Sequence, residues 1–490
     1  MREKGTKKLF MFLSILLSIF LLTTIANATV YMDIDNDGQK EPCYIVDQNH
    51  PNASNSWTRE QNDEEHPWKD AWYGAQQLYP GDVLLIKEGW YWNPNVHDVH
   101  DCGIKPARSG TSEAPITIKA YPGHTVYLSG GPSPDTDPNN FINMAIGAHH
   151  LYRSGFTDYI VIDGFKIYGA VGLVRTHGSV LKNCEIWGGG SGPHGFGNCV
   201  RLEWAYNCKI VNNIIHDNVR ITTETARNCP LLMEYHSFDC VIENNEFYNS
   251  VSIGLLFKVH ATNMTVRYNI FRNCNIGAQI RDTPGGEFNT SNIHVYQNIF
   301  MNDDTALVIN EDANTITIDN NIFYDNNIDI ALWDNIPDNI HVYNNIYSGS
   351  SHTFYHHCQE PSGINEFDYN CFYDQNGNWK VRWQVVATSL SEWQSYGDYH
   401  FDTHSIADDP LFVNPEAGDF HLRENSSCRN IGKDGVNMGA YITGNEIIGP
   451  IDLSQYIVEE ETLPTCASQN GVCCNENQIC QNGTFISSSD

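Results

Sequence analysis

Asparagine recurs through the middle of the chain at the end of short strand-like runs such as CVIENNEF and ITIDNNIF. Seven such residues follow one another at intervals of 32, 24, 29, 23, 24 and 25 residues: Asn213, Asn245, Asn269, Asn298, Asn321, Asn345 and Asn370. A repeat of this length without a helix-period pattern inside it is typical of a solenoid of strands, in which each unit stacks on the previous one. Residues one period apart therefore become neighbours in space.

Each of these asparagines is expected to occupy a tight turn between two strands. Asparagine tolerates left-handed backbone, and its amide can bond nearby backbone groups. Two residues later every repeat carries an apolar side chain: Ile215, Phe247, Phe271, Phe300, Phe323, Tyr347 and Phe372. Period-2 alternation places these on one side of the strand, so the sequence predicts an interior stack beside a ladder of amides.

The first 28 residues have the features of a secretory signal peptide. Basic residues at positions 2–8 precede an apolar run from Leu9 to Leu22, and Ala26-Asn27-Ala28 follows as a small-residue cleavage site. An uncleaved anchor is the alternative reading. No other stretch approaches the length that a membrane span needs. We therefore expect a mature chain without a membrane span that is secreted or lies at the cell surface.

The net charge of the chain limits the classes of partner that it is expected to bind. Removing residues 1–28 leaves 24 of 28 basic and 58 of 59 acidic residues, a formal charge of −34. Nucleic acid is therefore not an expected partner. An acidic polysaccharide is not excluded, because local basic residues or bound calcium can reverse the field in one groove. We expect the protein to be a monomer.

The chain divides into segments of different character. We expect an N-terminal cap and first coils over residues 29–140, with a short amphipathic helix within 67–78, and regular coils over 141–374. Residues 375–445 are expected to form C-terminal coils and a cap, and 446–490 a linker and a Cys-rich tail. The tail holds Cys466, Cys473, Cys474 and Cys480, which in an exported chain predict a small disulfide-bonded unit. Cys208 and Cys240 occupy equivalent places in successive coils. We expect them to be either buried free thiols or a disulfide bridge.

Several segments together resemble the secreted right-handed parallel β-helix proteins of the pectate lyase superfamily. They are PGDVLLIKEGWYW, APITIKAYPG, the NNIF-type repeats and the closing ADDPLFVN and GDFHL. The resemblance covers roughly residues 30 to 445. It implies an all-β fold with three sheets in each coil, the asparagine turn between the second and third sheets, and a substrate groove along the first sheet.

The first sheet can be located by counting back about eleven residues from each asparagine. This gives one row of outward positions: Glu203, Glu234, Lys258, Arg281, Asn310 and Trp333. Apolar residues alternate with them and are expected to point inward: Leu202, Met233, Phe257, Ile280, Ile309 and Leu332. Two residues further along, His236 and His260 form a second, shorter column. We regard these residues as candidates for substrate binding.

Parallel strands lie about 4.8 Å apart, so Lys258 is expected one spacing from Glu234 and one from Arg281. Abstraction of a proton α to a uronate carboxylate needs a base poised near the working pH and a cation that neutralises the carboxylate. The arginine favours a neutral lysine and the glutamate opposes it, so the sequence leaves the protonation state open. Trp333 could offer a face to a sugar ring.

The Lys258 and Arg281 pair is similar to the pair in chondroitinase B and related alginate lyases. That resemblance implies that Lys258 is the base and that Arg281 assists by neutralising the carboxylate. Those enzymes carry acidic metal ligands shortly before the lysine, where this chain has Ser250 and Ser252. A calcium ion in the groove would then need Glu203 and Glu234 as replacement ligands. The structural alternative is a solvated ladder of opposite charges on an exposed sheet.

A second candidate metal site lies near the mature N-terminus. Asp33, Asp35 and Asp37, followed by Gly38, match the opening of a calcium-binding loop. Position twelve is Tyr44 instead of a bidentate glutamate, so a plain acidic turn is the alternative. Calcium is the one cofactor that the sequence suggests.

Three functions are compatible with these patterns, because fold does not determine activity. The favoured one is a polysaccharide lyase that acts by β-elimination on a uronate-containing polymer. The second is a non-catalytic surface or adhesive protein that binds glycans. The third is a glycoside hydrolase, for which Asp282, Asp304 and Glu311 are candidates, although their spacing forms no clear pair.

Overall fold

The computed structural model contains two compact units, Met1–Pro450 and Ile451–Asp490, and each is considered by itself. It describes residues 30–34, 38, 40–92, 104–129, 144–146, 156–189, 198–218, 230–282, 289–310, 313–333, 338–356, 363–374, 381–382, 386–395, 400–451, 478–481 and 484–487. The expected signal peptide (residues 1–28) and the side chains of the four tail cysteines lie outside the described residues. In the second unit, the described backbone forms an antiparallel hairpin of β38 (Gln478–Gln481) and β39 (Thr484–Ser487).

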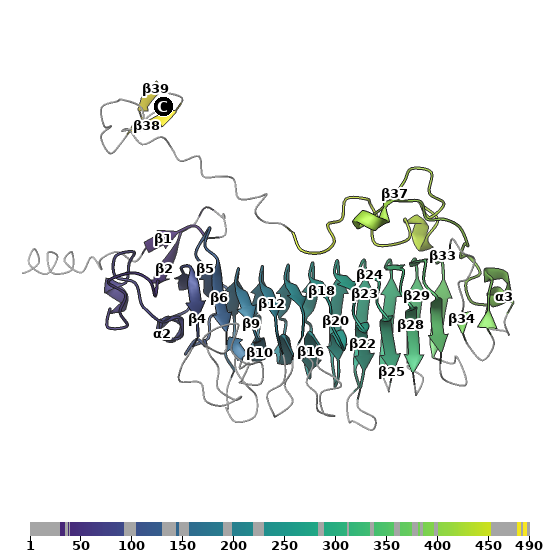
Figure 1. Cartoon of the computed structure of the whole chain (residues 1–490), viewed down its shortest axis with the longest axis horizontal. Coiled ribbons are helices and arrows are strands. Elements are labelled where there is room, and N and C mark those ends of the chain that lie inside the picture. The colour runs from purple at the N-terminus through teal and green to yellow at the C-terminus, as the bar shows by residue number, and fades with distance from the viewer. Residues whose placement is uncertain are drawn as a thin grey trace, which may run out of the picture. The chain divides into compact units, whose positions relative to one another are not determined.

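Three sheets build the first unit, and the chain visits them in the same order in successive coils (Figure 1). Their strands are parallel apart from one antiparallel pair at an edge of the first sheet and one at an edge of the second. Among the described residues the first sheet contains β7 (Met144–Ile146), β10 (Ala170–His177), β13 (Val200–Tyr206), β16 (Leu232–Tyr235), β19 (Ile253–Phe257), β22 (Ile276–Arg281), β25 (Thr305–Asn310), β28 (Ile328–Trp333), β31 (His352–His356), β34 (Val381–Arg382) and β35 (Val386–Ala387). The second contains β1 (Val30–Met32), β2 (Glu41–Val46), β3 (Val83–Ile86), β5 (Ile116–Ala120), β8 (Ile160–Asp163), β11 (Val180–Lys182), β14 (Lys209–Val211), β17 (Val241–Glu243), β20 (Thr262–Arg267), β23 (Ser291–Tyr296), β26 (Asn314–Asp319), β29 (Asp338–Tyr343) and β32 (Ile364–Asp368). The third contains β4 (Gly89–Tyr91), β6 (Val126–Ser129), β9 (Lys166–Tyr168), β12 (Glu185–Trp187), β15 (Ile214–His216), β18 (Glu246–Tyr248), β21 (Ile270–Arg272), β24 (Ile299–Met301), β27 (Ile322–Tyr324), β30 (Ile346–Ser348) and β33 (Cys371–Tyr373). The fold is a right-handed parallel β-helix, which confirms the fold class predicted from the repeats.

The asparagine ladder is present and buried. From Asn213 to Asn345, each backbone N–H donates to the Oδ1 of the next ladder asparagine at 2.9–3.0 Å. Each side-chain amide also donates to that Oδ1 and to the carbonyl oxygen of the residue two positions earlier. All seven side chains have zero exposed area. The ladder therefore supplies the hydrogen bonds that buried backbone groups at the corner require.

The left-handed residue at this corner is not the ladder asparagine, which corrects the sequence expectation. It is the residue immediately before it, with φ between 53° and 58°: Asn212, Asn244, Tyr268, Gln297, Asn320, Asn344 and Tyr369. Glutamine and tyrosine occur at that position as well as asparagine, so the backbone conformation does not explain the repeat. The ladder residue is asparagine because its amide is the right length to donate and accept inside the turn.

Aromatic side chains two residues after the ladder form the predicted interior stack. From Phe247 to Phe372, successive ring centroids lie 4.6–5.3 Å apart and nearly parallel. The thiols of Cys208 and Cys240 are buried beside the second sheet, where the backbone N–H of Cys208 donates to Cys240 Sγ at 3.4 Å. In the described part of the chain these two cysteines are free thiols.

The two ends of the coil stack are covered differently. Helix α2 (Ala71–Gln77) lies within the expected amphipathic segment and packs on β2 and β3, burying Ala71, Gly74 and Ala75. A short 3₁₀ turn, η1 (Arg59–Gln61), precedes it. Near the other end, α3 (Leu390–Gln394) buries Trp393.

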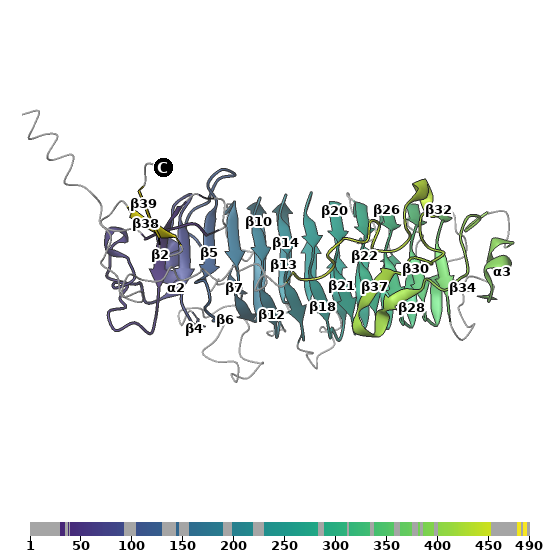
Figure 2. The same ribbon diagram turned by 90° about the horizontal axis from the view of Figure 1, so that it is seen from above.

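After the last coil the chain turns back and covers part of the third sheet. This C-terminal cover, residues 406–449, contains β36 (Phe412–Asn414), β37 (Asp419–Leu422) and the 3₁₀ turns η3 (Pro415–Ala417) and η4 (Lys433–Gly435). Its buried apolar side chains, including Phe420 and Met438, form one cluster with Ile299, Ile322 and Ile346 of the third sheet. Figure 2 shows this yellow-green segment running back along the coils. The outer face of the third sheet is therefore partly an internal interface.

Candidate functional site

The strand register of the first sheet places most of the predicted residues in one outward row. Pairings between neighbouring strands align Glu203 with Tyr235, Arg281 with Asn310, and Asn310 with Trp333. Phe257 pairs with Ile280, so the next residue of each strand, Lys258 and Arg281, are also neighbours. The row therefore reads Glu203, Tyr235, Lys258, Arg281, Asn310, Trp333.

Glu234 does not belong to this row, and the prediction for it was wrong. It pairs with Leu202 on one side and Phe257 on the other, which places it among the inward residues with no exposed area. Met233, expected inside, lies in an outer-face apolar cluster with Leu256. The cause is the corner after the first sheet, which is one residue longer after Lys258 than after Tyr235. Because a one-residue slip turns every side chain to the other face, a count from the asparagine ladder fails here.

Lys258 is half-buried in the centre of the row and surrounded by positive charge. Its pKa is lowered from the ordinary value, first by burial and then by the guanidinium groups of Arg281 and Arg201. With Glu234 turned inward, Tyr235 takes the neighbouring place in the row. The carboxylate expected to keep Lys258 protonated is thus replaced in the row by the phenol of Tyr235, and Arg201 adds a second guanidinium beside Arg281. All the causes that act on this lysine favour its neutral form.

Arg201 and Glu203 form a buried ion pair at the edge of this group. Arg201 Nε lies 2.5 Å from Glu203 Oε2, and both side chains are buried. Burial raises the pKa of the Glu203 carboxyl, and the positive charges of Arg201 and Arg175 oppose this. The close guanidinium holds the carboxylate in place, while the charge of Arg201 still lowers the pKa of Lys258.

His236 and His260 meet edge to face at the corner where the first sheet ends, with an angle of 86° between their rings. Their ring centroids are 5.7 Å apart, and Trp204 stacks on His236 at 4.6 Å. Burial lowers the pKa of both imidazoles; His260 lowers that of His236 further, and the negative charge of Asp282 opposes the shift in both. The lowered pKa favours the neutral form of both imidazoles, and the rings extend the row as a polar and aromatic flank.

Asn310 and Trp333 lie at the far end of the row. Asn310 is buried and its Oδ1 accepts a hydrogen bond from Gln279 Nε2 at 3.1 Å. Trp333 is partly buried and packs against the apolar cluster of the outer face. The row thus runs from the Arg201–Glu203 pair, through a phenol, a lysine and a guanidinium, to an amide and an indole.

The carboxylates proposed for a hydrolase do not face one another across this row. Asp282 is buried and accepts a hydrogen bond from the backbone N–H of Thr290. Asp304 is exposed in the turn before β25, where its carboxylate accepts from Asn327 Nδ2 at 3.1 Å. Glu311 lies outside the described residues. The described positions therefore lack the facing carboxylate pair that glycoside hydrolysis uses.

Calcium does not fit the residues of the groove. Glu234 points into the interior, where its Oε1 accepts from the backbone N–H of Ser237 at 2.6 Å, and burial raises its pKa well above the ordinary value. Glu203 is engaged by Arg201. No three His, Cys, Asp or Glu side chains in the described part of the chain are placed to hold a metal ion.

The N-terminal acidic segment is only partly described. Asp33 Oδ2 accepts from the backbone N–H of Gly38 at 3.0 Å, which is the geometry of a side-chain-closed turn. Asp35 and Asp37 lie outside the described residues. The calcium loop therefore stays a prediction.

Two residues of the site were missed by the sequence reasoning. Tyr235 was hidden by the register error at Glu234. Arg201 lies two residues before Glu203 on β13, on the same face, and period-2 alternation from Glu203 would have identified it. Both contribute to the environment of Lys258, so the site has one more cation and one more phenol than expected.

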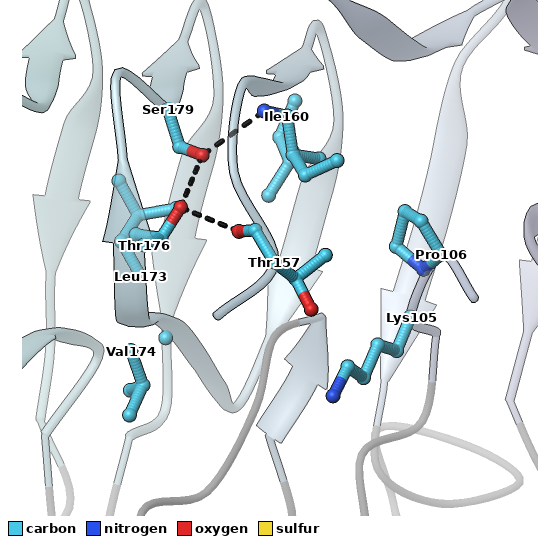
Figure 3. A pocket seen from close by; sticks show the side chains of 10 residues that line it. Lys105, Pro106, Thr157, Ile160, Leu173, Val174, Thr176 and Ser179 are labelled. Carbon is cyan, nitrogen blue, oxygen red and sulfur yellow. Dashed lines mark hydrogen bonds between the residues drawn. The ribbon is translucent and has the colours of Figure 1, made fainter. Parts of the chain in front are cut away.

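A small hollow lies beside β10, between that strand and Lys105 (Figure 3). Its volume is about 30 Å³, which is room for about one water. Its polar lining is already engaged, because Thr176 Oγ1 donates to the Thr157 carbonyl oxygen at 2.6 Å. This hollow is too small for a saccharide unit.

None of the helices in the described part of the chain combines the length and apolarity that crossing a bilayer requires. The family model for the periplasmic copper-binding protein NosD matches residues 138–371. A comparison with curated proteins found no match.

Solved structures with a similar arrangement are distant in sequence. A complex of XylC with xylose is 12% identical, covers 74% of this chain and 82% of its own, and has a TM-score of 0.47. Pectate lyase Pel9A is 11% identical over 81% of this chain and 95% of its own, with a TM-score of 0.47. The A-module of the mannuronan C-5 epimerase AlgE4 of Azotobacter vinelandii is 11% identical over 67% and 91%, with a TM-score of 0.39. These likenesses say nothing about activity.

Proposed function

We propose that this chain is an exported polysaccharide lyase that cleaves a uronate-containing polymer by β-elimination on the first sheet. One observation carries the proposal: Lys258 is half-buried in an outward row, and burial, Arg281 and Arg201 all lower its pKa. A general base must be unprotonated at the working pH, and such surroundings produce a neutral lysine. Perturbed groups of this kind concentrate at functional sites.

Arg281 is the residue suited to the substrate carboxylate. It lies one strand from Lys258, a separation of about 4.8 Å along the sheet, and it is partly exposed. A guanidinium can bind a carboxylate through two hydrogen bonds and stabilise the charge that develops on the enolate. Arg201 is already engaged by Glu203, so its role is to hold that pair and to raise the local potential.

The chemical step balances with these groups. Lys258 Nζ takes the proton from the carbon α to the uronate carboxylate, and Arg281 stabilises the resulting enolate. Collapse of the enolate forms a carbon–carbon double bond and breaks the bond from the adjacent carbon to the glycosidic oxygen. That oxygen takes a proton from solvent, and the protonated lysine later returns its proton to solvent. No metal is needed for this sequence of steps.

The test is the appearance of the unsaturated uronate, followed by its ultraviolet absorbance, with pectate, alginate and glycosaminoglycans as substrates. Lys258→Ala is expected to lower kcat by about 10²–10⁴-fold, the usual contribution of a general base. Lys209→Ala, an exposed lysine on the second sheet, is the matched control and should retain full activity. The rate should rise with pH along a limb whose apparent pKa lies below the ordinary value of lysine.

Two results would contradict the proposal. Product formation that survives Lys258→Ala would remove this lysine from the mechanism. If purified protein retains a bound uronate polymer but yields neither unsaturated product nor new reducing ends on any polymer, the row is a binding surface and the protein belongs to the non-catalytic class.

A further inference from the structure

A cavity of about 220 Å³ lies between the outer face of the third sheet and the C-terminal cover. Its floor comes from one outward column, in which Ser348 stands between Tyr324 on one side and Tyr373 on the other. Because a serine stands where both its neighbours in the column are tyrosines, the column lacks one aromatic side chain at this position. Since adjacent strands are about 4.8 Å apart, the notch between the two tyrosine positions is roughly 10 Å wide.

The cover closes this notch with both apolar and polar groups. Pro410 and Phe412 contribute apolar walls, and Asp409 and Arg423 contribute charged groups at the rim. The Tyr324 hydroxyl lies 3.2 Å from Glu416 Oε1, within hydrogen-bond distance. The lining thus combines polar groups with aromatic and proline side chains, and specifically placed polar groups are what orient a small ligand in its site.

The loop that forms the wall is held by hydrogen bonds at Leu411. Leu411 has a φ of 52°, a left-handed conformation that costs energy for a branched side chain. Its backbone N–H donates to Asp409 Oδ1 at 2.8 Å, and its carbonyl oxygen accepts from the backbone N–H of Arg423 at 3.1 Å. Two hydrogen bonds thus stabilise this conformation of Leu411 in the wall of the cavity.

The charge around the cavity selects the class of ligand. Arg423 is opposed by Asp409 at the rim and by Glu416 beside Tyr324, and Asp325 lies close enough to Glu416 for their charges to interact. This excess of carboxylates disfavours an anion. The volume corresponds to about seven water molecules, at about 30 Å³ each, which is the size of one sugar ring.

We propose that this cavity binds one neutral sugar unit, at a site separate from the cationic row of the first sheet. Tyrosine, phenylalanine and proline would cover the apolar face of the ring, and the hydroxyls of the sugar would bond Asp409, Arg423 and Ser348. The site would hold a neutral residue or branch of a polymer. It is independent of the proposed lyase activity.

Calorimetry or saturation-transfer NMR on the full chain tests this with glucose, galactose, mannose and xylose, and with glucuronate as the anionic comparator. Binding of at least one neutral sugar with a Kd of about 1 mM is expected, typical of a single small ring. Ser348→Phe fills the notch without changing charge and should weaken binding at least tenfold. Ser351→Phe, an exposed serine outside the cavity, and Lys258→Ala should bind as the unaltered protein does.

A second variant tests the site in case Ser348→Phe does not fold. Asp409→Asn keeps an oxygen for the Leu411 N–H but removes the charge, and weaker binding of neutral sugar by this variant supports the site. Failure of every neutral sugar to bind the unaltered protein overturns the proposal. So does equal binding by Ser348→Phe with an unchanged melting curve, or tighter binding of glucuronate than of the neutral sugars. Lyase activity is unaffected by any of these outcomes.

Discussion

At the scale of single residues, the interior of the coil stack contains carboxyl groups whose pKa is raised by burial, which favours their neutral form. Glu234, Asp303 and Asp329 are fully or almost fully buried, and burial is the first cause that raises the pKa of each. Asp303 occupies a second ladder, where its Oδ1 accepts from the N–H of Cys274 at 2.7 Å and its own N–H donates to Asn326 Oδ1 at 2.9 Å. A protonated acid can substitute for an asparagine there, whereas a carboxylate cannot donate.

Because of Asp329, the stability of the folded protein is expected to depend on pH. Its pKa is raised to about 8 by burial, although Ser350 and Asn326 donate hydrogen bonds to it. Because the folded pKa exceeds the unfolded one, its stabilising contribution is complete below about pH 4 and is lost as pH rises toward 8. The free energy of unfolding should therefore fall with pH over this window, by at most about 1.4 kcal/mol per pH unit for this residue. Asp329→Asn should flatten the slope.

Urea denaturation at several pH values between 4 and 8 measures this effect. Asp304→Asn, which changes an exposed carboxylate one coil earlier, is the control and should leave the slope as it is. Equal slopes for Asp329→Asn and the unaltered protein would show that Asp329 is ionised in the folded state.

The sequence predicted the residues of the candidate row well, apart from one. Glu203, Lys258, Arg281, Asn310 and Trp333 follow from alternation because each has a clear apolar neighbour. The run LLMEYH is apolar over three consecutive positions and offers no alternation, so Glu234 and Tyr235 could not be distinguished by pattern. Burial of a glutamate inside a coil also runs against the ordinary preference of charged residues for the surface, and no local sequence signal indicates it.

At the scale of elements, the coils are joined by their ladders as much as by their strands. Asn298 Nδ2 donates to the carbonyl oxygens of Val266 and Tyr296 at 2.9 and 3.0 Å, and its Oδ1 accepts from Asn269. Asn298→Ala would leave these buried groups without partners and open a small void. We expect a loss of about 3 kcal/mol in the free energy of unfolding, since an unsatisfied buried group costs about 1–3 kcal/mol.

Chemical denaturation of the purified variants measures this loss. Asn327→Ala, an exposed asparagine of the turn before β28, is the matched control and should change stability by less than about 0.5 kcal/mol. A loss at Asn298 no larger than at Asn327 would mean that strand pairing alone holds the coils together.

The corners between elements are where sequence reasoning was weakest. The repeat interval varies between 23 and 32 residues because loops of different length leave the corners, while the strands keep constant register. The extra residue after Lys258 is one such variation, and the strands on both sides of it keep their pairing. Whether an inserted residue lies before or after a given corner can be read only from the pairing of the strands.

At the scale of the whole molecule, the repeats predicted the fold from residue 30 onward, but not the way the last segment is used. Residues 375–445 were expected to form C-terminal coils and a cap, with strand character at 407–422. Strands are present there, as an antiparallel pair of β36 with β37 within a cover on the third sheet. The signal was present in the outward column of that sheet, where Ile299, Ile322 and Ile346 are apolar although alternation turns them away from the interior.

This arrangement predicts different effects for two truncations. A chain that ends after Pro450 keeps every buried apolar cluster of the described residues, since all their members lie between Val30 and Ile448. Its Tm should lie within about 2 °C of that of the full chain, a shift below the effect of 1 kcal/mol in a domain of this size.

A chain that ends after Thr403 loses the cover and exposes the three isoleucines together with Tyr324 and Cys371. It should bind a hydrophobic dye, melt at least several degrees lower and aggregate, because contiguous apolar surface of this kind is rarely left exposed. Thermal melts of the three chains, followed by circular dichroism and dye fluorescence, test both predictions. If the chain without the cover is as stable and soluble as the full chain, the coils are self-sufficient and the apolar outer column needs another partner.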